Sequence, residues 1–164
     1  MNNFSEDSNI ECKSLKKAIG QKSDVEALAE TCVCFANAQG GTLVIGIENK
    51  QSEPPTDQKI DPEELNKVVS RLRTLTSGVG LVNPEIITHE NGGEYFIIKV
   101  LPSARTIATT TSGKVLIRIS DNCYSVRSEE LTDLAAEKNA FQWELVVVQK
   151  TTLVQADQTQ IDFF

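Results

Sequence analysis

The sequence has few aromatic residues and only one histidine, and both shortages argue against particular kinds of site. Only nine of its 164 residues are Phe, Trp or Tyr. Tyr124 alone lies among the basic clusters, so a platform that stacks nucleotide bases is not expected. The single histidine, His89, is more typical of a surface or hairpin position than of a metal ligand or general base.

The cysteines lack the spacing of metal-binding or redox motifs. Cys12, Cys32, Cys34 and Cys123 form no CxxC pair and have no matching His/Cys pair, which argues against a zinc site. No secretory signal is recognisable in the first residues, so the sequence predicts a cytoplasmic location, where thiols stay reduced. We therefore expect reduced, mostly buried thiols.

Two further absences exclude a membrane span and a nucleotide-binding loop. No run approaches the roughly 18 uncharged apolar residues that a spanning helix requires, so no membrane partner is expected. Neither GxGxxG nor GxxxxGK[ST] occurs, so the chain is not expected to be an ATPase.

The net charge of −7 argues against indiscriminate binding of nucleic acid, but the charge is unevenly distributed. Residues 12–22 carry four lysines and no acid, and residues 99–127 also have a net charge of +4, whereas residues 51–66 have a net charge of −4. This pattern allows a basic face on an acidic protein. Solvated cations scattered over the surface are an equally good interpretation.

Apolar periodicity and turn signals predict an α+β fold, with a mixed β-sheet flanked by helices. Ser23 and Glu26 resemble a capping box at the start of a helix, and Asp61 with Pro62 marks the start of a second one. The Asn91-Gly92-Gly93 sequence is typical of a β-hairpin turn. The expected helices are 23–36, 61–75 and 128–138, and the expected strands are 42–48, 85–90, 94–102 and 115–120.

Gly40 and Gly41 stand between the first long helix and the strand that follows it. Phosphate-binding glycine loops have the opposite order, with a strand before and a helix after, so that helix N–H groups face the anion. Here an anion would meet helix carbonyls. The two glycines are therefore expected to end the helix and turn the chain.

The stretch "VEALAETCVCFANAQGGTLVIGIENK", preceded by "IECK", resembles the Schlafen/AlbA-like DNA-binding domain of bacterial and archaeal proteins. The resemblance covers about residues 6–138, and we place the domain at residues 1–140. Residues 141–164 would be a C-terminal extension or the start of a truncated downstream region. The residues that carry the motif are Phe35, Asn37, Gly40, Gly41 and Gly46.

The resemblance implies two kinds of site. Family members that cleave RNA use a metal site, which would be formed here by Glu6, Glu11 and Asn49, with Lys13 beside it and Glu6, Glu11 and Lys13 as the catalytic set. Asn49 stands where those nucleases have an acid, and this substitution weakens the binding of a cation.

A nucleic-acid-binding surface would instead use cations to contact phosphates. These are Lys13, Lys16, Lys17, Arg105, Lys114, Arg118 and Arg127.

We therefore predict a nucleic-acid-binding N-terminal domain of a bacterial transcriptional regulator or helicase-related protein. It would contact the nucleic-acid backbone, DNA being the favoured partner, without strong base readout. No cofactor and no enzymatic activity are expected of this segment. One alternative is a metal-dependent Schlafen-like ribonuclease, which would need a divalent metal. Another is a module for protein interaction or homodimerisation.

Overall fold

The computed structural model describes residues 8–48 and 51–138, and its contacts divide into two compact units. One unit contains the residues up to Ser103 together with Ala108–Val126. The other combines Ala104–Ile107 with the residues from Arg127 onward. The predicted boundary at residue 140 lies outside the described residues and stays a prediction.

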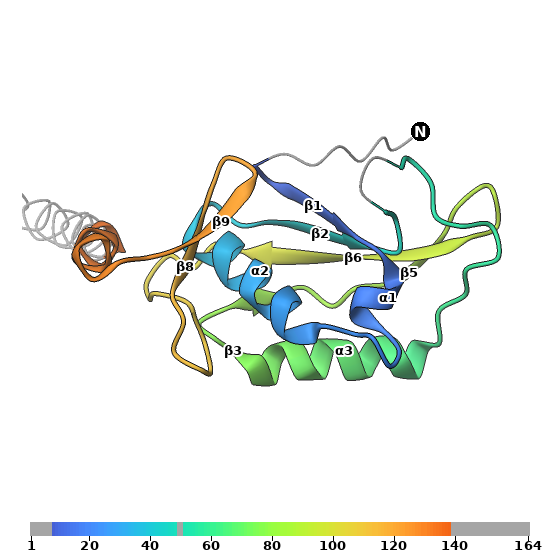
Figure 1. Ribbon diagram of the computed structural model, residues 1–164, viewed down its shortest axis with the longest axis horizontal. Helices are drawn as coiled ribbons and strands as arrows, with labels where there is room; N and C mark the ends of the chain where they lie inside the picture. Colours follow the sequence, from blue (N-terminus) through green and yellow to red (C-terminus); the bar gives the residue numbers. More distant parts are fainter. Residues whose placement is uncertain (1–7, 49–50, 139–164) are drawn as a thin grey trace, which may run out of the picture. The chain divides into compact units, whose positions relative to one another are not determined.

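The larger unit is built on a five-stranded mixed sheet (Figure 1). Strand β1 (Ile10–Lys13) runs parallel to β2 (Gly41–Ile45), which pairs antiparallel with β6 (Glu94–Leu101). The last of these also pairs with β4 (Gly80–Leu81) and β5 (Ile86–Thr88). The β5–β6 pair is the hairpin that Asn91-Gly92-Gly93 predicts, and the α+β prediction with a mixed sheet is confirmed.

The helices begin where local capping groups are available. Helix α3 (Pro62–Leu75) has Asp61 as its N-cap, and the Asp61 carboxylate accepts the Glu63 N–H, as predicted. The short α1 (Leu15–Ala18) precedes α2 (Val25–Asn37). The prediction that Ser23 caps α2 is wrong, because Asp24 occupies that position and its Oδ1 accepts the Ala27 N–H at 3.1 Å.

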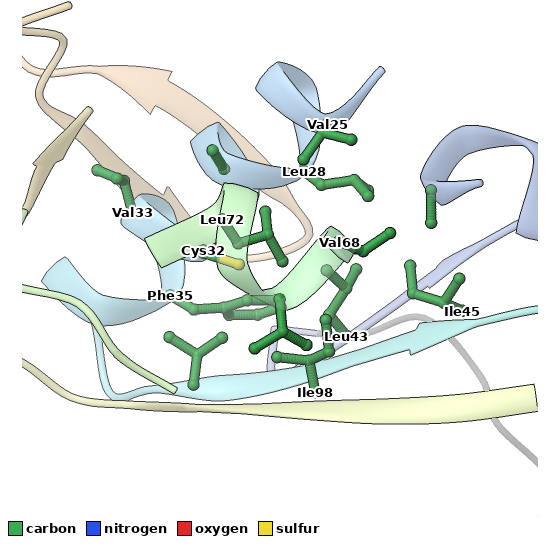
Figure 2. Packing of buried hydrophobic residues seen from close by; sticks show 14 of the residues in the cluster. Val25, Leu28, Cys32, Val33, Phe35, Leu43, Ile45, Val68, Leu72 and Ile98 are labelled. Atoms are coloured by element: carbon green, nitrogen blue, oxygen red, sulfur yellow. The ribbon is translucent and has the colours of Figure 1, made fainter. Parts of the chain in front are cut away.

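The main core lies between the helices and one face of the sheet (Figure 2). Because side chains alternate along a strand, Leu43 and Ile45 point toward α2 and α3, whereas Val44 points to the opposite face. Val44 belongs there to a second, smaller cluster with Cys12, Ile47 and Tyr95. The main cluster includes Val25, Leu28, Cys32, Phe35, Leu43, Ile45, Val68, Leu72 and Ile98.

Two small antiparallel pairs complete the larger unit. Strand β3 (Thr76–Ser77) pairs with β7 (Thr109–Thr110), and β8 (Leu116–Ile119) forms a hairpin with β9 (Asn122–Ser125). In the other unit, the chain is helical from Ser128 to the last described residue, Lys138. None of the helices within the described ranges has both the length and the apolar character of a membrane span.

Candidate functional site

Among the described residues of the larger unit, Arg118 on β8 is the most buried cation. Leu116 and Arg118 alternate with more exposed residues and point inward from this short strand. The guanidinium carbon of Arg118 lies 4.7 Å from the centre of the Phe35 ring, a cation–π contact with α2. Only 2% of the Arg118 side chain is exposed, so this residue is part of the packed interior rather than of a free basic surface.

Arg118 connects the β8–β9 hairpin to β1 through an ion pair and contacts to the backbone. Its Nη2 lies 2.9 Å from Oε2 of Glu11. Its Nε donates a hydrogen bond to the Ser8 carbonyl at 3.2 Å, and Nη2 is 3.5 Å from the Ile10 carbonyl. A buried charge needs a partner and satisfied donors, and Arg118 obtains both from the start of β1.

Glu11 is shared between two cations. Its Oε2 faces Arg118, and its Oε1 accepts from Nζ of Lys13, which stands two residues further along β1 on the same side of the strand. Exposure rises along this series, from 2% for the Arg118 side chain through 14% for Glu11 to 34% for Lys13. Two positive groups and one carboxylate therefore form a network that reaches solvent at Lys13.

Phe35 and Gly41 fit together where α2 turns into β2. A Cβ on Gly41 would stand only 2.2 Å from Cδ1 of Phe35, so any side chain there would displace the ring that supports Arg118. Gly40 adopts a positive φ of 79°, and its N–H donates to the Phe35 carbonyl at 2.8 Å. The predicted turn at the paired glycines is confirmed, and it lies beside helix carbonyls rather than an anion site. The helix itself ends earlier, at Asn37, with Ala38 rather than a glycine as its C-cap.

Asn37 joins the end of α2 to two segments that are distant in sequence. Its Nδ2 donates to the carbonyls of Ala108 and Leu116, each at 2.8 Å. Its Oδ1 accepts the Ala108 N–H, also at 2.8 Å. All three bonds are buried, so Asn37 satisfies backbone groups that would otherwise lack partners and fixes β8 beside α2.

Comparison with known proteins supports the sequence resemblance. The family model described as "Schlafen, AlbA_2" matches residues 6–127, which is most of the chain. The chain belongs to the Schlafen, AlbA_2 family. Its fold is similar to the crystal structure of the DIP2311 protein from Corynebacterium diphtheriae, with a TM-score of 0.51 and 22% identity. That match covers 73% of this chain but only 25% of the other. No curated protein matches significantly.

Not all the cations predicted to bind nucleic acid are free in this Schlafen, AlbA_2 domain. Lys13 and Arg118 share Glu11, and Lys114 pairs with Glu30. The hydrogen bond from Lys114 to Glu30, with their charge attraction, raises the pKa of Lys114 above its ordinary value. These three residues therefore do not contribute unpaired positive charge to the predicted binding surface. The sequence shows the cations but not the carboxylates that pair with them in the fold.

The remaining predicted cations fall into two groups. Lys16 and Lys17 are exposed on α1. Arg105 and Arg127 are also exposed, but they belong to the other contact unit of the domain. Lys16 and Lys17 can thus act with Lys13 at the junction of β1 and α1. They are the members of the predicted set that lie in the larger unit, are exposed and have no ion-pair partner among the described residues.

The metal site suggested for ribonuclease members is only partly covered by the described residues. Glu6 and Asn49 lie outside them, so the predicted trio of Glu6, Glu11 and Asn49 stays a prediction. Within residues 8–48 and 51–138, no three His, Cys, Asp or Glu side chains come together as a metal-binding group. The described member, Glu11, has both carboxylate oxygens engaged by cations.

A disulfide between Cys34 and Cys123 contradicts the expectation of reduced thiols. The two Cα atoms are 5.8 Å apart although 89 positions separate them in sequence. Packing of the β8–β9 hairpin on α2 brings them together, and neither cysteine stands in a motif that signals this pairing. Cys12 and Cys32 form no disulfide and are buried, as predicted. Burial raises the pKa of the Cys32 thiol to about 12.

Proposed function

We propose that this domain binds nucleic acid through backbone phosphates, with a cluster of lysines at the β1–α1 junction as the contact surface. This lysine corner consists of Lys13, Lys16, Lys17 and Lys22. The observation that carries the proposal is the charge balance there. Glu11 is the only acid between residues 8 and 23, and buried Arg118 offsets its charge from the inside.

The three outer lysines of the corner are available to a ligand. Lys16, Lys17 and Lys22 are exposed, and no described carboxylate lies within ion-pair distance of them. A lysine ammonium binds phosphate as a point charge without a fixed orientation. Such a surface recognises the phosphate backbone and carries little information about base sequence.

A salt titration of binding tests this proposal. Affinity for duplex DNA, single-stranded DNA and RNA is measured for the chain and for the Lys16→Gln/Lys17→Gln/Lys22→Gln variant. Loss of three phosphate contacts reduces the slope of log K against log salt concentration by about 2 to 3 for duplex, at about 0.9 per contact. Among the three nucleic acids, the one bound most tightly at the same salt concentration is the preferred partner.

The matched control removes the same charge from α3. Lys67, Arg71 and Arg73 are exposed on that helix, and the Lys67→Gln/Arg71→Gln/Arg73→Gln variant has the same net charge as the test variant. We expect it to keep most of the salt slope. Equal loss in both variants, or no binding by the wild type at low salt, would overturn the assignment of the lysine corner.

The ribonuclease alternative is addressed by the same protein preparations. A metal ion at Glu11 would have to replace its contacts with Lys13 and Arg118, because both carboxylate oxygens are engaged. We therefore expect no RNA cleavage with Mg²⁺ or Mn²⁺. Cleavage that disappears in a Glu11→Gln variant would establish the enzyme instead.

The setting of the domain in a longer protein also belongs to this proposal. We propose, from the family resemblance, that the domain is a module of a bacterial transcriptional regulator or helicase-related protein in the cytoplasm.

The alternative binding role is protein interaction through homodimerisation. Light scattering on the isolated chain distinguishes it, since a stable dimer that ignores DNA and RNA at low salt would favour a protein-interaction module.

A further inference from the structure

The Cys34–Cys123 disulfide lies directly beside the contacts that hold Arg118. Cys34 is the residue before Phe35, whose ring lies under the guanidinium. Cys123 is the cross-strand partner of Arg118 in the β8–β9 hairpin. The covalent bond and the cation–π contact thus join the same two elements, α2 and the hairpin, at neighbouring positions.

The β8–β9 hairpin has few other attachments at its outer strand. All four residues of β9 are exposed, and its strand pairing is with β8 alone. Inward contacts of the hairpin come from β8, through Leu116 and Arg118. Because a two-stranded hairpin is marginal without packing support, the bond from Cys123 to α2 is a principal restraint on β9.

We propose that Cys34 and Cys123 form a redox-sensitive staple that, when oxidised, holds the β8–β9 hairpin on α2 and keeps Arg118 on Glu11. Reduction would free β9 from α2 and loosen the hairpin. Arg118 would then leave Glu11, whose negative charge would remain beside Lys13. If the proposed function is right, nucleic-acid binding weakens in the reduced state; the structural part of the proposal does not depend on it.

The reductant is a dithiol, and the exchange balances as a two-electron reaction. A thiolate of the dithiol attacks the sulfur of Cys123, the exposed partner, and the S–S bond breaks with Cys34 leaving as a thiolate that takes up a proton. The second thiol of the reductant then attacks the mixed disulfide. Cys123 is released as a thiol, and the reductant ends as its own disulfide.

Free-thiol counting establishes whether the staple forms. Protein equilibrated with oxidised glutathione is denatured without reductant and alkylated, and peptide mapping then locates the labels. We expect label at Cys12 and Cys32 only, with all four cysteines labelled after treatment with dithiothreitol. Alkylation of Cys34 and Cys123 in the oxidised sample would overturn the proposal.

Hydrogen exchange then tests the loosening. We expect amides of residues 115–126 to exchange on the order of tenfold or more faster after reduction, since exchange through local opening reports the opening constant. Cys32 serves as an internal reference, because its buried thiol stays unreactive toward alkylation while the core is intact. Unchanged exchange, or exposure of Cys32 on reduction, would overturn a local staple.

Two variants separate the bond from general effects of the reductant. Cys123→Ser removes the exposed partner, so its hairpin should exchange fast in both redox states. Cys12→Ala removes a buried cysteine that is outside the disulfide, so it should keep the redox response of the wild type. If Cys123→Ser retains slow exchange, packing alone holds the hairpin and the proposal fails. The comparison of oxidised with reduced wild type decides the matter should a variant not fold.

Binding of DNA and RNA is measured on the same samples as a separate readout. Faster hairpin exchange with weaker binding supports both the staple and its coupling to the lysine corner. Faster exchange with unchanged binding keeps the staple and overturns the coupling. Absence of binding in the oxidised state overturns the proposed function alone, because the exchange result stands without any nucleic acid.

Discussion

Arg118 and Glu11 form an ion pair of 2.9 Å between strands that belong to different sheets. Glu11 lies on β1 of the mixed sheet, and Arg118 lies on β8 of a separate hairpin. Phe35 on α2 lies against the guanidinium from a third element. Through these two contacts, Arg118 links three parts of the larger unit that are far apart in sequence. Substitutions at Arg118 therefore test whether these contacts stabilise the domain.

Replacing Arg118 by Met should destabilise the domain by about 3 kcal/mol, because removing one partner of a buried pair leaves the other charge without compensation. The loss is read from urea unfolding. Glu11 keeps Lys13 as a partner, so the cost is expected at the lower end for buried pairs. Adding Glu11→Gln to the variant should recover part of the loss in a double-mutant cycle.

The control for this prediction is Arg73→Met on α3, where the guanidinium is exposed and bonds to Asn83. It should change the free energy of unfolding by less than about 0.5 kcal/mol. If Arg118→Met costs no more than this control, the ion pair has no structural role.

Removing the Asn37 amide should cost about 3 kcal/mol. Asn37→Ala leaves the Ala108 N–H and the carbonyls of Ala108 and Leu116 without their buried partner. Each such group costs about 1–3 kcal/mol when unsatisfied, and partial relaxation limits the sum. Asn66→Ala on the exposed side of α3 is the matched control. Equal unfolding midpoints for the two variants would contradict the assigned role.

Much of the fold was predictable because its signals are local. The Asp61-Pro62 start of α3 and the Asn91-Gly92-Gly93 turn each depend on a few neighbouring residues, and the structure confirms both. The wrong N-cap predicted for α2 is also a local matter. Ser23 and Asp24 are neighbouring residues of types that both cap helices well, and in the structure Asp24 is the cap. The two-residue strands β3, β4 and β7 have no pattern of sufficient length to recognise.

The candidate site was less predictable because its contacts are long-range. Charge counting treated Arg118 as a surface cation, although alternation along "LIRI" places it on the same side as buried Leu116. The carboxylate partner of Arg118 is Glu11 on β1. Cys34 and Cys123 form a disulfide although 89 positions separate them in the sequence. A single sequence gives residue types but not these juxtapositions, which depend on the packing of the hairpin on α2.

A methyl group on Gly41 should destabilise the domain by about 2–3 kcal/mol. The added Cβ would lie 2.2 Å from the Phe35 ring, and overpacking of a well-filled core costs about this much. Phe35→Leu, which makes room, should recover at least about 0.5 kcal/mol in a double-mutant cycle measured by urea unfolding. Strictly additive losses would show that the two residues do not meet.

The Glu94 carboxylate should make stability depend on pH in the acid range. The backbone N–H of Ile60 and then the ammonium of Lys59 bond to it, and both lower the pKa of Glu94 below its ordinary value of 4.5. A carboxylate whose pKa is lower in the folded than in the unfolded state stabilises the protein when the pH is above the unfolded-state pKa. This contribution disappears as pH falls through the folded-state pKa.

The free energies of urea unfolding of wild type and Glu94→Gln should therefore differ most at neutral pH and converge below pH 4.5. A wild-type advantage that is constant across this range would mean that the bonds to Ile60 and Lys59 do not favour the charged form of Glu94.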